Sequence, residues 1–147
     1  MTEQGTPPVV VDWASLAAQA QPTRRRVRLC LRGDLLADLA SAQDTGDNER
    51  AEALRDEIDA NTVEFVLRGL TQDKYRALIA AHPDPDGSAW NDATFPEALV
   101  RACILTPTVG PSDPLFTVLT AGQVEQLFTA AIESCIEVDA APLPKRG

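Results

Sequence analysis

The sequence has few aromatic residues, few cysteines and no long apolar run. Aromatic residues make up 5% of the 147 residues, so a core must depend on leucine, valine, isoleucine and alanine. Cys30, Cys103 and Cys135 are odd in number, far apart and without C-x-x-C spacing, which argues against a disulfide framework and a zinc site. No stretch reaches the roughly 18 apolar residues of a membrane-spanning helix. Residues 1–8 lack the pattern of a secretory signal.

The charge balance narrows the range of partners. Thirteen Lys and Arg residues stand against 22 Asp and Glu residues, a formal net charge of -9. Such a charge repels phosphate backbones and anionic bilayers. We therefore expect no nucleic-acid partner and no membrane partner, and the three widely spaced cysteines favour a reducing cytoplasm. The length suits one domain, which we expect over residues 9–139, between a flexible N-terminal arm (residues 1–8) and a flexible C-terminal tail (residues 140–147).

Motifs of enzymes are also missing. The sequence has no glycine-rich phosphate loop, G-x-S-x-G elbow or H-E-x-x-H motif. His82, Asp84 and Asp86 could converge on a cation, but the glycine and glutamate of a calcium loop would fall on Ala89 and Phe95. The simpler interpretation is a helix end followed by turns. We expect no catalytic residues, no metal and no cofactor, with a small metal-dependent regulator or enzyme as an alternative.

The cysteines offer little reactive chemistry. Cys103 and Cys135 lie on the apolar faces of expected helices, where a thiol packs in the core and stays inert. Cys30 alternates with arginines, so an exposed and weakly activated thiol is an alternative there.

Two short runs, Arg26–Arg32 and Val63–Arg68, alternate between apolar and charged residues. Val27, Leu29 and Leu31 share one face of the first run, which predicts a half-buried strand. Val63, Phe65 and Leu67 share one face of the second. Since both runs flank one helical stretch, they can pair, with Glu64 opposite an arginine of the first strand.

Helical spacing fills most of the remaining chain. Two stripes, residues 35–42 and 51–58, predict an αα-hairpin between the strands. Asp12 and Thr71 are expected N-caps, the first for a short helix whose Trp13 face docks on the body. Thr94 and Thr120 each begin a capping box, and residues 106–114 should be an extended connector. The expected fold is α+β and mostly α: a small two-stranded sheet flanking an αα-hairpin, packed with three or four further helices.

The surface of the strands suggests a binding site. We name Arg26, Arg28, Arg32, Val66 and Arg68 as candidate partner-binding residues. The alternative is that these arginines protect an edge strand and pair with the acidic helices nearby. The open edges of the ribbon are covered by the chain's own helices or by another chain, so self-association stays open.

A groove along the last helix is a further possibility. It would be lined by Tyr75, Phe95 and Leu99 and could accept a helix of a partner. The same residues are also expected to form the intramolecular core.

The order of these segments resembles the tail assembly chaperones of long-tailed phages and prophages of actinobacteria. The likeness runs from about Val27 to Ile136 and rests on five segments: Arg26–Leu36, Val63–Leu70, Tyr75–Pro83, Trp90–Leu99 and Gly122–Phe128. The resemblance implies a non-enzymatic protein that associates with the tape-measure protein, keeps it soluble during tail assembly and leaves before the virion is complete. It also implies that a longer form can arise by ribosomal frameshifting. The alternative role is a virion structural subunit, such as a tail terminator or head–tail connector.

Overall fold

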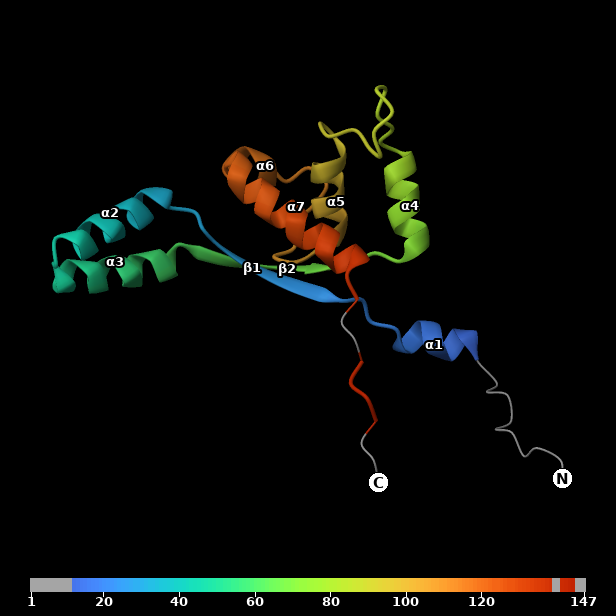
Figure 1. The fold of residues 1–147 in the computed structure, drawn as a ribbon, viewed down its shortest axis with the longest axis horizontal. Helices are drawn as coiled ribbons and strands as arrows, with labels where there is room; N and C mark the ends of the chain where they lie inside the picture. The colour runs from blue at the N-terminus through green and yellow to red at the C-terminus, as the bar shows by residue number, and fades with distance from the viewer. Residues whose placement is uncertain (1–11, 139–140, 145–147) are drawn as a thin grey trace.

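The computed structural model describes residues 12–138 and 141–144 as a mixed α/β protein, 53% helical, with seven helices and a three-stranded antiparallel sheet in that part of the chain (Figure 1). The helices are α1 (Trp13–Gln19), α2 (Gly33–Asp44), α3 (Asn48–Ala60), α4 (Gln72–Ala80), α5 (Phe95–Cys103), α6 (Leu115–Val118) and α7 (Ala121–Ile136). The strands are β1 (Arg24–Cys30), β2 (Thr62–Arg68) and β3 (Ile104–Thr106).

The sheet has the order β1-β2-β3, so the expectation of two strands was wrong. β1 and β2 pair along their whole length, from Arg24 opposite Arg68 to Cys30 opposite Thr62. β3 follows α5 directly and pairs antiparallel with the end of β2, where the register is irregular. The third strand ends at Thr106, the first residue of the segment expected to be a connector.

One face of the sheet is covered by helices and forms the main core. α7 packs on β1 and β2, and α5 packs against α7 and against β2 (Figure 1). Alternate strand residues such as Leu29, Phe65 and Leu67 are buried there, together with Phe95 and Leu99 of α5. The groove expected around Tyr75, Phe95 and Leu99 is therefore filled: Phe95 and Leu99 are fully buried, and Tyr75 packs edge-on against Phe95.

The helices α2 and α3 form a separate projection from the sheet (Figure 1). They are neighbours joined by a short turn with Gly46 at a φ of 72°, a conformation that glycine adopts without strain. Their contact has its own small apolar cluster of Leu35, Ala42, Ala51 and Leu54. The two helices thus bury their stripes against each other, apart from the main core.

Helix α1 does not dock as expected. Asp12 caps it by accepting hydrogen bonds from the amides of Ala14 and Ser15, but every residue of the helix is exposed, and Trp13 has 75% of its surface in solvent. Figure 1 shows α1 extending away from the sheet. Amphipathic spacing predicted an apolar face, but the described part of this chain does not bury that face.

The expected helix caps have mixed outcomes. Thr120 and Gln123 form the complete capping box at the start of α7, and Thr71 caps α4. The box at Thr94 is absent, although α5 does begin there. The Thr94 hydroxyl is instead within 2.8 Å of His82 Nδ1, so this side chain ties α5 to the end of α4.

Some expectations fall on parts of the chain outside this description. The N-terminal arm, residues 1–8, lies outside the described residues, as do residues 9–11 and 139 of the expected domain and residues 140 and 145–147 of the expected C-terminal tail. In the described ranges, no helix has the length and apolar character needed to cross a bilayer.

Candidate protein-binding face

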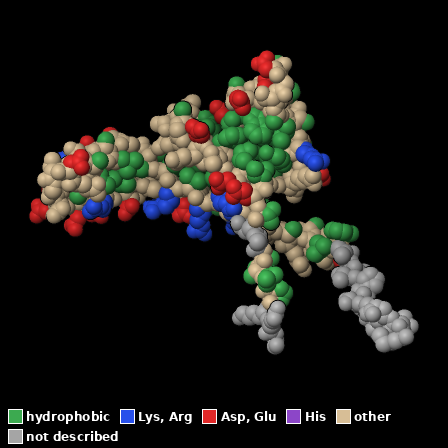
Figure 2. All heavy atoms as spheres, viewed as in Figure 1, with side chains coloured by type: hydrophobic (Ala, Val, Ile, Leu, Met, Phe, Trp, Pro, Cys, Tyr) green, Lys and Arg blue, Asp and Glu red, His purple; other side chains and the backbone are tan. Residues whose placement is uncertain are grey.

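The second face of the sheet is exposed and carries a row of arginines. Arg24, Arg26 and Arg28 are the exposed residues of β1, each separated by a residue turned toward α7. On β2 the same face presents Glu64, Val66 and Arg68. We call these six residues the arginine face. Figure 2 shows Lys and Arg side chains gathered beneath the sheet, between the α2–α3 projection and the C-terminal segment.

The arginine face is locally basic in an acidic protein. Its four arginines and one glutamate give a local charge of +3, against -9 for the whole chain. Side chains two residues apart on a strand are separated by about 6.6 Å, so the row of β1 presents evenly spaced cations. Such a row is complementary to carboxylates on a partner surface.

Two of these arginines have weak ion pairs. Arg26 Nη1 lies 3.2 Å from Glu64 Oε1, and Arg28 Nη2 lies 3.8 Å from Asp59 of α3. The side chains of Arg26 and Arg28 are 77% and 65% exposed. Exposed pairs of this kind contribute about 0–1 kcal/mol each, so a partner carboxylate could replace them at little cost.

The other two arginines face each other. Arg24 and Arg68 are directly opposed across β1 and β2, and like charges in such positions destabilise a sheet. Among the described residues, no carboxylate lies within ion-pair distance of either guanidinium. The fold therefore keeps an unfavourable pair that an acidic partner would relieve.

β1 is also the outer strand of the sheet in the described part of the chain. Leu31 donates its amide hydrogen to Asn61, and Gly69 donates to Thr23, so the odd-numbered residues of β1 direct their main-chain groups toward β2. The main-chain groups of Arg24, Arg26 and Arg28 then point outward, and the Arg24 carbonyl accepts a hydrogen bond from Arg25 Nη1. The part of this edge at Arg26 and Arg28 can accept a further strand. Two β1 edges from separate copies would bring arginine rows together, which disfavours self-pairing.

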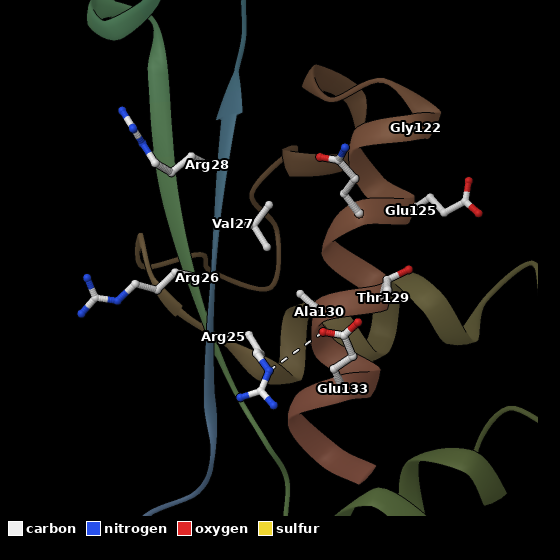
Figure 3. Close-up of a pocket in the computed structure, with 10 residues that line it drawn as sticks. Arg25, Arg26, Val27, Arg28, Gly122, Glu125, Thr129, Ala130 and Glu133 are labelled. Carbon is white, nitrogen blue, oxygen red and sulfur yellow. Dashed lines mark ion pairs between the residues drawn. The ribbon is translucent and has the colours of Figure 1, made fainter. Parts of the chain in front are cut away.

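Polar contacts connect helix α7 to β1 near both ends of the helix, and a groove lies between the helix and the strand. Gln123 Nε2 donates to the carbonyl of Cys30 over 2.9 Å, while Arg25 lies 3.9 Å from Glu133 and 3.6 Å from Glu137. The open groove between these contacts has a volume of about 740 Å³. In Figure 3, Arg25 and Val27 point toward α7, whereas Arg26 and Arg28 point away from it.

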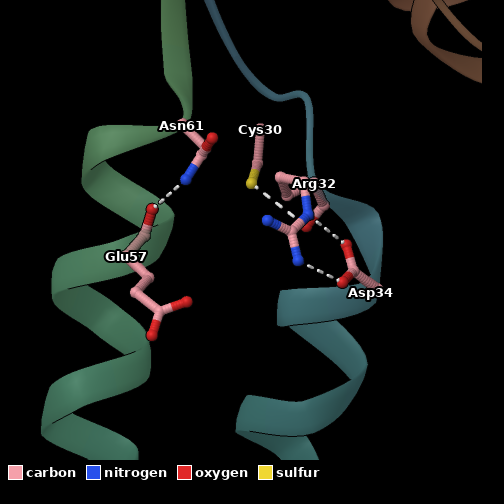
Figure 4. A network of polar contacts seen from close by, with 5 residues as sticks. All are labelled: Cys30, Arg32, Asp34, Glu57 and Asn61. Atoms are coloured by element: carbon pink, nitrogen blue, oxygen red, sulfur yellow. Dashed lines mark hydrogen bonds and ion pairs between the residues drawn. The ribbon is translucent and has the colours of Figure 1, made fainter.

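Arg32 does not belong to the arginine face. It follows β1 at the start of α2, where Nε and Nη2 donate to the Asp34 carboxylate over 2.9 and 2.6 Å (Figure 4). The hydrogen bond to Arg32 lowers the pKa of Asp34, and the same contact raises the pKa of the Arg32 guanidinium. The structure thus brings together four of the five candidate residues, Arg26, Arg28, Val66 and Arg68.

The candidate metal residues are engaged in local structure. The His82 ring packs edge-on against Phe95, in addition to its contact with Thr94. The Asp84 carboxylate accepts hydrogen bonds from the amides of Asp86 and Ser88. The hydrogen bond from the Asp86 amide is the main cause that lowers the pKa of Asp84. Within the described ranges, no group of three or more His, Cys, Asp or Glu side chains is placed to hold a metal ion.

Sequence reasoning missed Arg24 and Arg25. The first strand was expected to begin at Arg26, but β1 begins at Arg24. Continuing the alternation backwards would have placed Arg24 beside Arg26 and turned Arg25 to the covered face. The run Arg24–Arg26 already contained this alternation, but the expected strand boundary excluded Arg24 and Arg25.

Comparisons of the chain with known protein families, curated proteins and solved structures gave no match.

Proposed function

We propose that this protein is a non-enzymatic assembly chaperone that binds another polypeptide through the arginine face. The observation that supports this most directly is the exposed sheet face, with Arg24 and Arg68 opposed and without a carboxylate partner in the described part of the chain. A face of this kind costs stability in the free protein and becomes favourable when a partner supplies carboxylates. The client segment is therefore acidic on the side that meets the sheet.

The proposed client is the tape-measure protein of a long-tailed phage or prophage. The resemblance of Arg26–Leu36, Val63–Leu70 and the later segments to tail assembly chaperones supports this choice. In that role the protein binds the client in the bacterial cytoplasm, prevents its aggregation and leaves before the particle is complete. Because the contact is largely electrostatic and exposed, release needs no chemical step.

The test is co-expression with the tape-measure protein of the same phage or prophage. We expect the unaltered chain to increase the soluble fraction of the client. The double variant Arg26→Glu, Arg28→Glu should weaken binding about tenfold or more, since it removes two cations and adds two repulsive charges, and tenfold corresponds to about 1.4 kcal/mol.

A matched control makes the same charge change elsewhere. Arg50→Glu, Arg55→Glu alters two exposed arginines of α3, so net charge changes equally while the arginine face is untouched. This control should keep client binding, and circular dichroism should show that both variants are folded. Equal binding by the two double variants would refute the assignment of the face. Recovery of the chain from purified particles by mass spectrometry would favour the virion subunit instead.

A further inference from the structure

Two cysteines that are distant in the sequence have their thiols in contact. Cys103 is the last residue of α5, and Cys135 lies in the last turn of α7. Their sulfur atoms are 3.8 Å apart. Cys103 is fully buried, whereas Cys135 is only partly buried. The third cysteine, Cys30, is at the end of β1, where its thiol donates to the carbonyl of Arg32.

The surroundings make the two thiols chemically different. The hydrogen bond from Cys103 lowers the pKa of the Cys135 thiol, and the amide of Leu70, 3.4 Å from the Cys135 sulfur, acts in the same direction. The pKa of Cys103 is raised by the same hydrogen bond and by burial. Cys135 is also the more exposed of the two thiols. Since the attacking sulfur must be reached by the reagent and reacts as the thiolate, Cys135 is the attacking sulfur and Cys103 is the resolving one.

We propose that Cys103 and Cys135 are a redox-modification site that forms an intramolecular disulfide between α5 and α7 on reaction with a low-molecular-weight disulfide. The Cys135 thiolate attacks one sulfur of the reagent, which forms a mixed disulfide and releases one thiolate. Cys103 then loses its proton to solvent and attacks the Cys135 sulfur, which expels the second thiolate. Two protein thiols and one small disulfide thus become one protein disulfide and two small thiols.

The position of the site gives the disulfide a structural effect. It would join the two helices that cover the sheet, in the turn of α7 that also carries Glu133, an ion-pair partner of Arg25. Oxidation would therefore fix the helical layer behind the arginine face without touching the exposed arginines. This site is independent of the proposed function, because it rests only on the two sulfurs and their burial.

The test uses the full chain and oxidised glutathione. We expect the intact mass to fall by about 2 Da, the mass of the two hydrogens lost, and the free thiols in denaturant to fall from three to one. Proteolysis without reductant should give one linked pair of peptides containing Cys103 and Cys135. Cys30→Ser should form the same disulfide, which makes it the matched control.

The single variants separate the two steps. Cys103→Ser should stop at a glutathione adduct on Cys135, because the resolving thiol is gone. Cys135→Ser should form neither the disulfide nor an adduct at buried Cys103. An unchanged mass in the unaltered chain, adducts without the internal disulfide, or a disulfide that contains Cys30 would each overturn the proposal, whether or not the variants fold.

Discussion

Replacing Gly69 by alanine tests the close approach of β2 to α7. A Cβ atom at Gly69 would overlap the carbonyl oxygen of Ser134 and lie 2.9 Å from its carbonyl carbon. Because these are main-chain atoms of a packed helix, relief requires the helix and the strand to separate. Such overpacking costs about 1–3 kcal/mol, and we expect the upper part of that range. For a domain near this size, the melting temperature should fall by about 5–10 °C.

A second glycine provides the control with the same chemical change. A Cβ atom at Gly122, in the first turn of α7, meets nothing within 4 Å. Gly122→Ala should stabilise the helix by up to about 1 kcal/mol. The same methyl group is therefore expected to have opposite effects at two sites that both involve α7.

The assay is denaturant unfolding followed by the fluorescence of Trp90. This ring stacks on Phe95 with centroids 4.7 Å apart, so its emission reports the main core. Both glycine variants are best made in a Trp13→Phe background, which removes the exposed indole of α1. If Gly69→Ala unfolds at the same denaturant concentration as its parent, the described contact between β2 and α7 is wrong.

Three further outcomes follow from single side chains. Thr120→Ala should cost about 1 kcal/mol in denaturant unfolding because it removes the α7 cap, while Thr120→Ser should keep most of that stability; equal losses would refute the cap. Trp13→Phe should remove mainly the solvent-exposed, red-shifted part of the tryptophan emission, and a loss of blue emission would mean that α1 is docked. The rate of Cys135 alkylation should rise with pH, with a midpoint below that of an ordinary cysteine, because the hydrogen bond from Cys103 lowers its pKa; in Cys103→Ala, which removes the donor, the midpoint should move to higher pH.

Local patterns predicted the elements whose residues decide their own conformation. The alternation of Val27 and Leu29 is enough to give β1, and the Thr120 to Gln123 spacing is enough to give the start of α7. At Thr94 the same spacing failed, because the hydroxyl has a competing partner in His82. A capping box can be recognised from four residues, but a competing contact from a distant residue cannot.

The features that the sequence did not predict depend on contacts between distant segments. β3 has three residues and gains its hydrogen bonds from β2, so no period could be recognised in it. The apolar spacing of α1 says nothing about whether a receiving surface exists in the same chain. The approach of Cys103 to Cys135 joins residues 32 positions apart and required the packing of α5 on α7. The alternation of the arginines was visible in the sequence. The sequence did not show that the described helices pack on the opposite face of the sheet.

The α2–α3 projection begins and ends at adjacent positions, because Cys30 and Thr62 are directly paired. Two neighbouring antiparallel strands can be joined by a turn of two residues, so the sheet does not require residues 31–61 for its connection. The buried residues of the projection also form a cluster of their own. We therefore expect the projection to be replaceable: changing its length by whole helical turns should alter how far the molecule reaches while the sheet that carries the arginines keeps its shape.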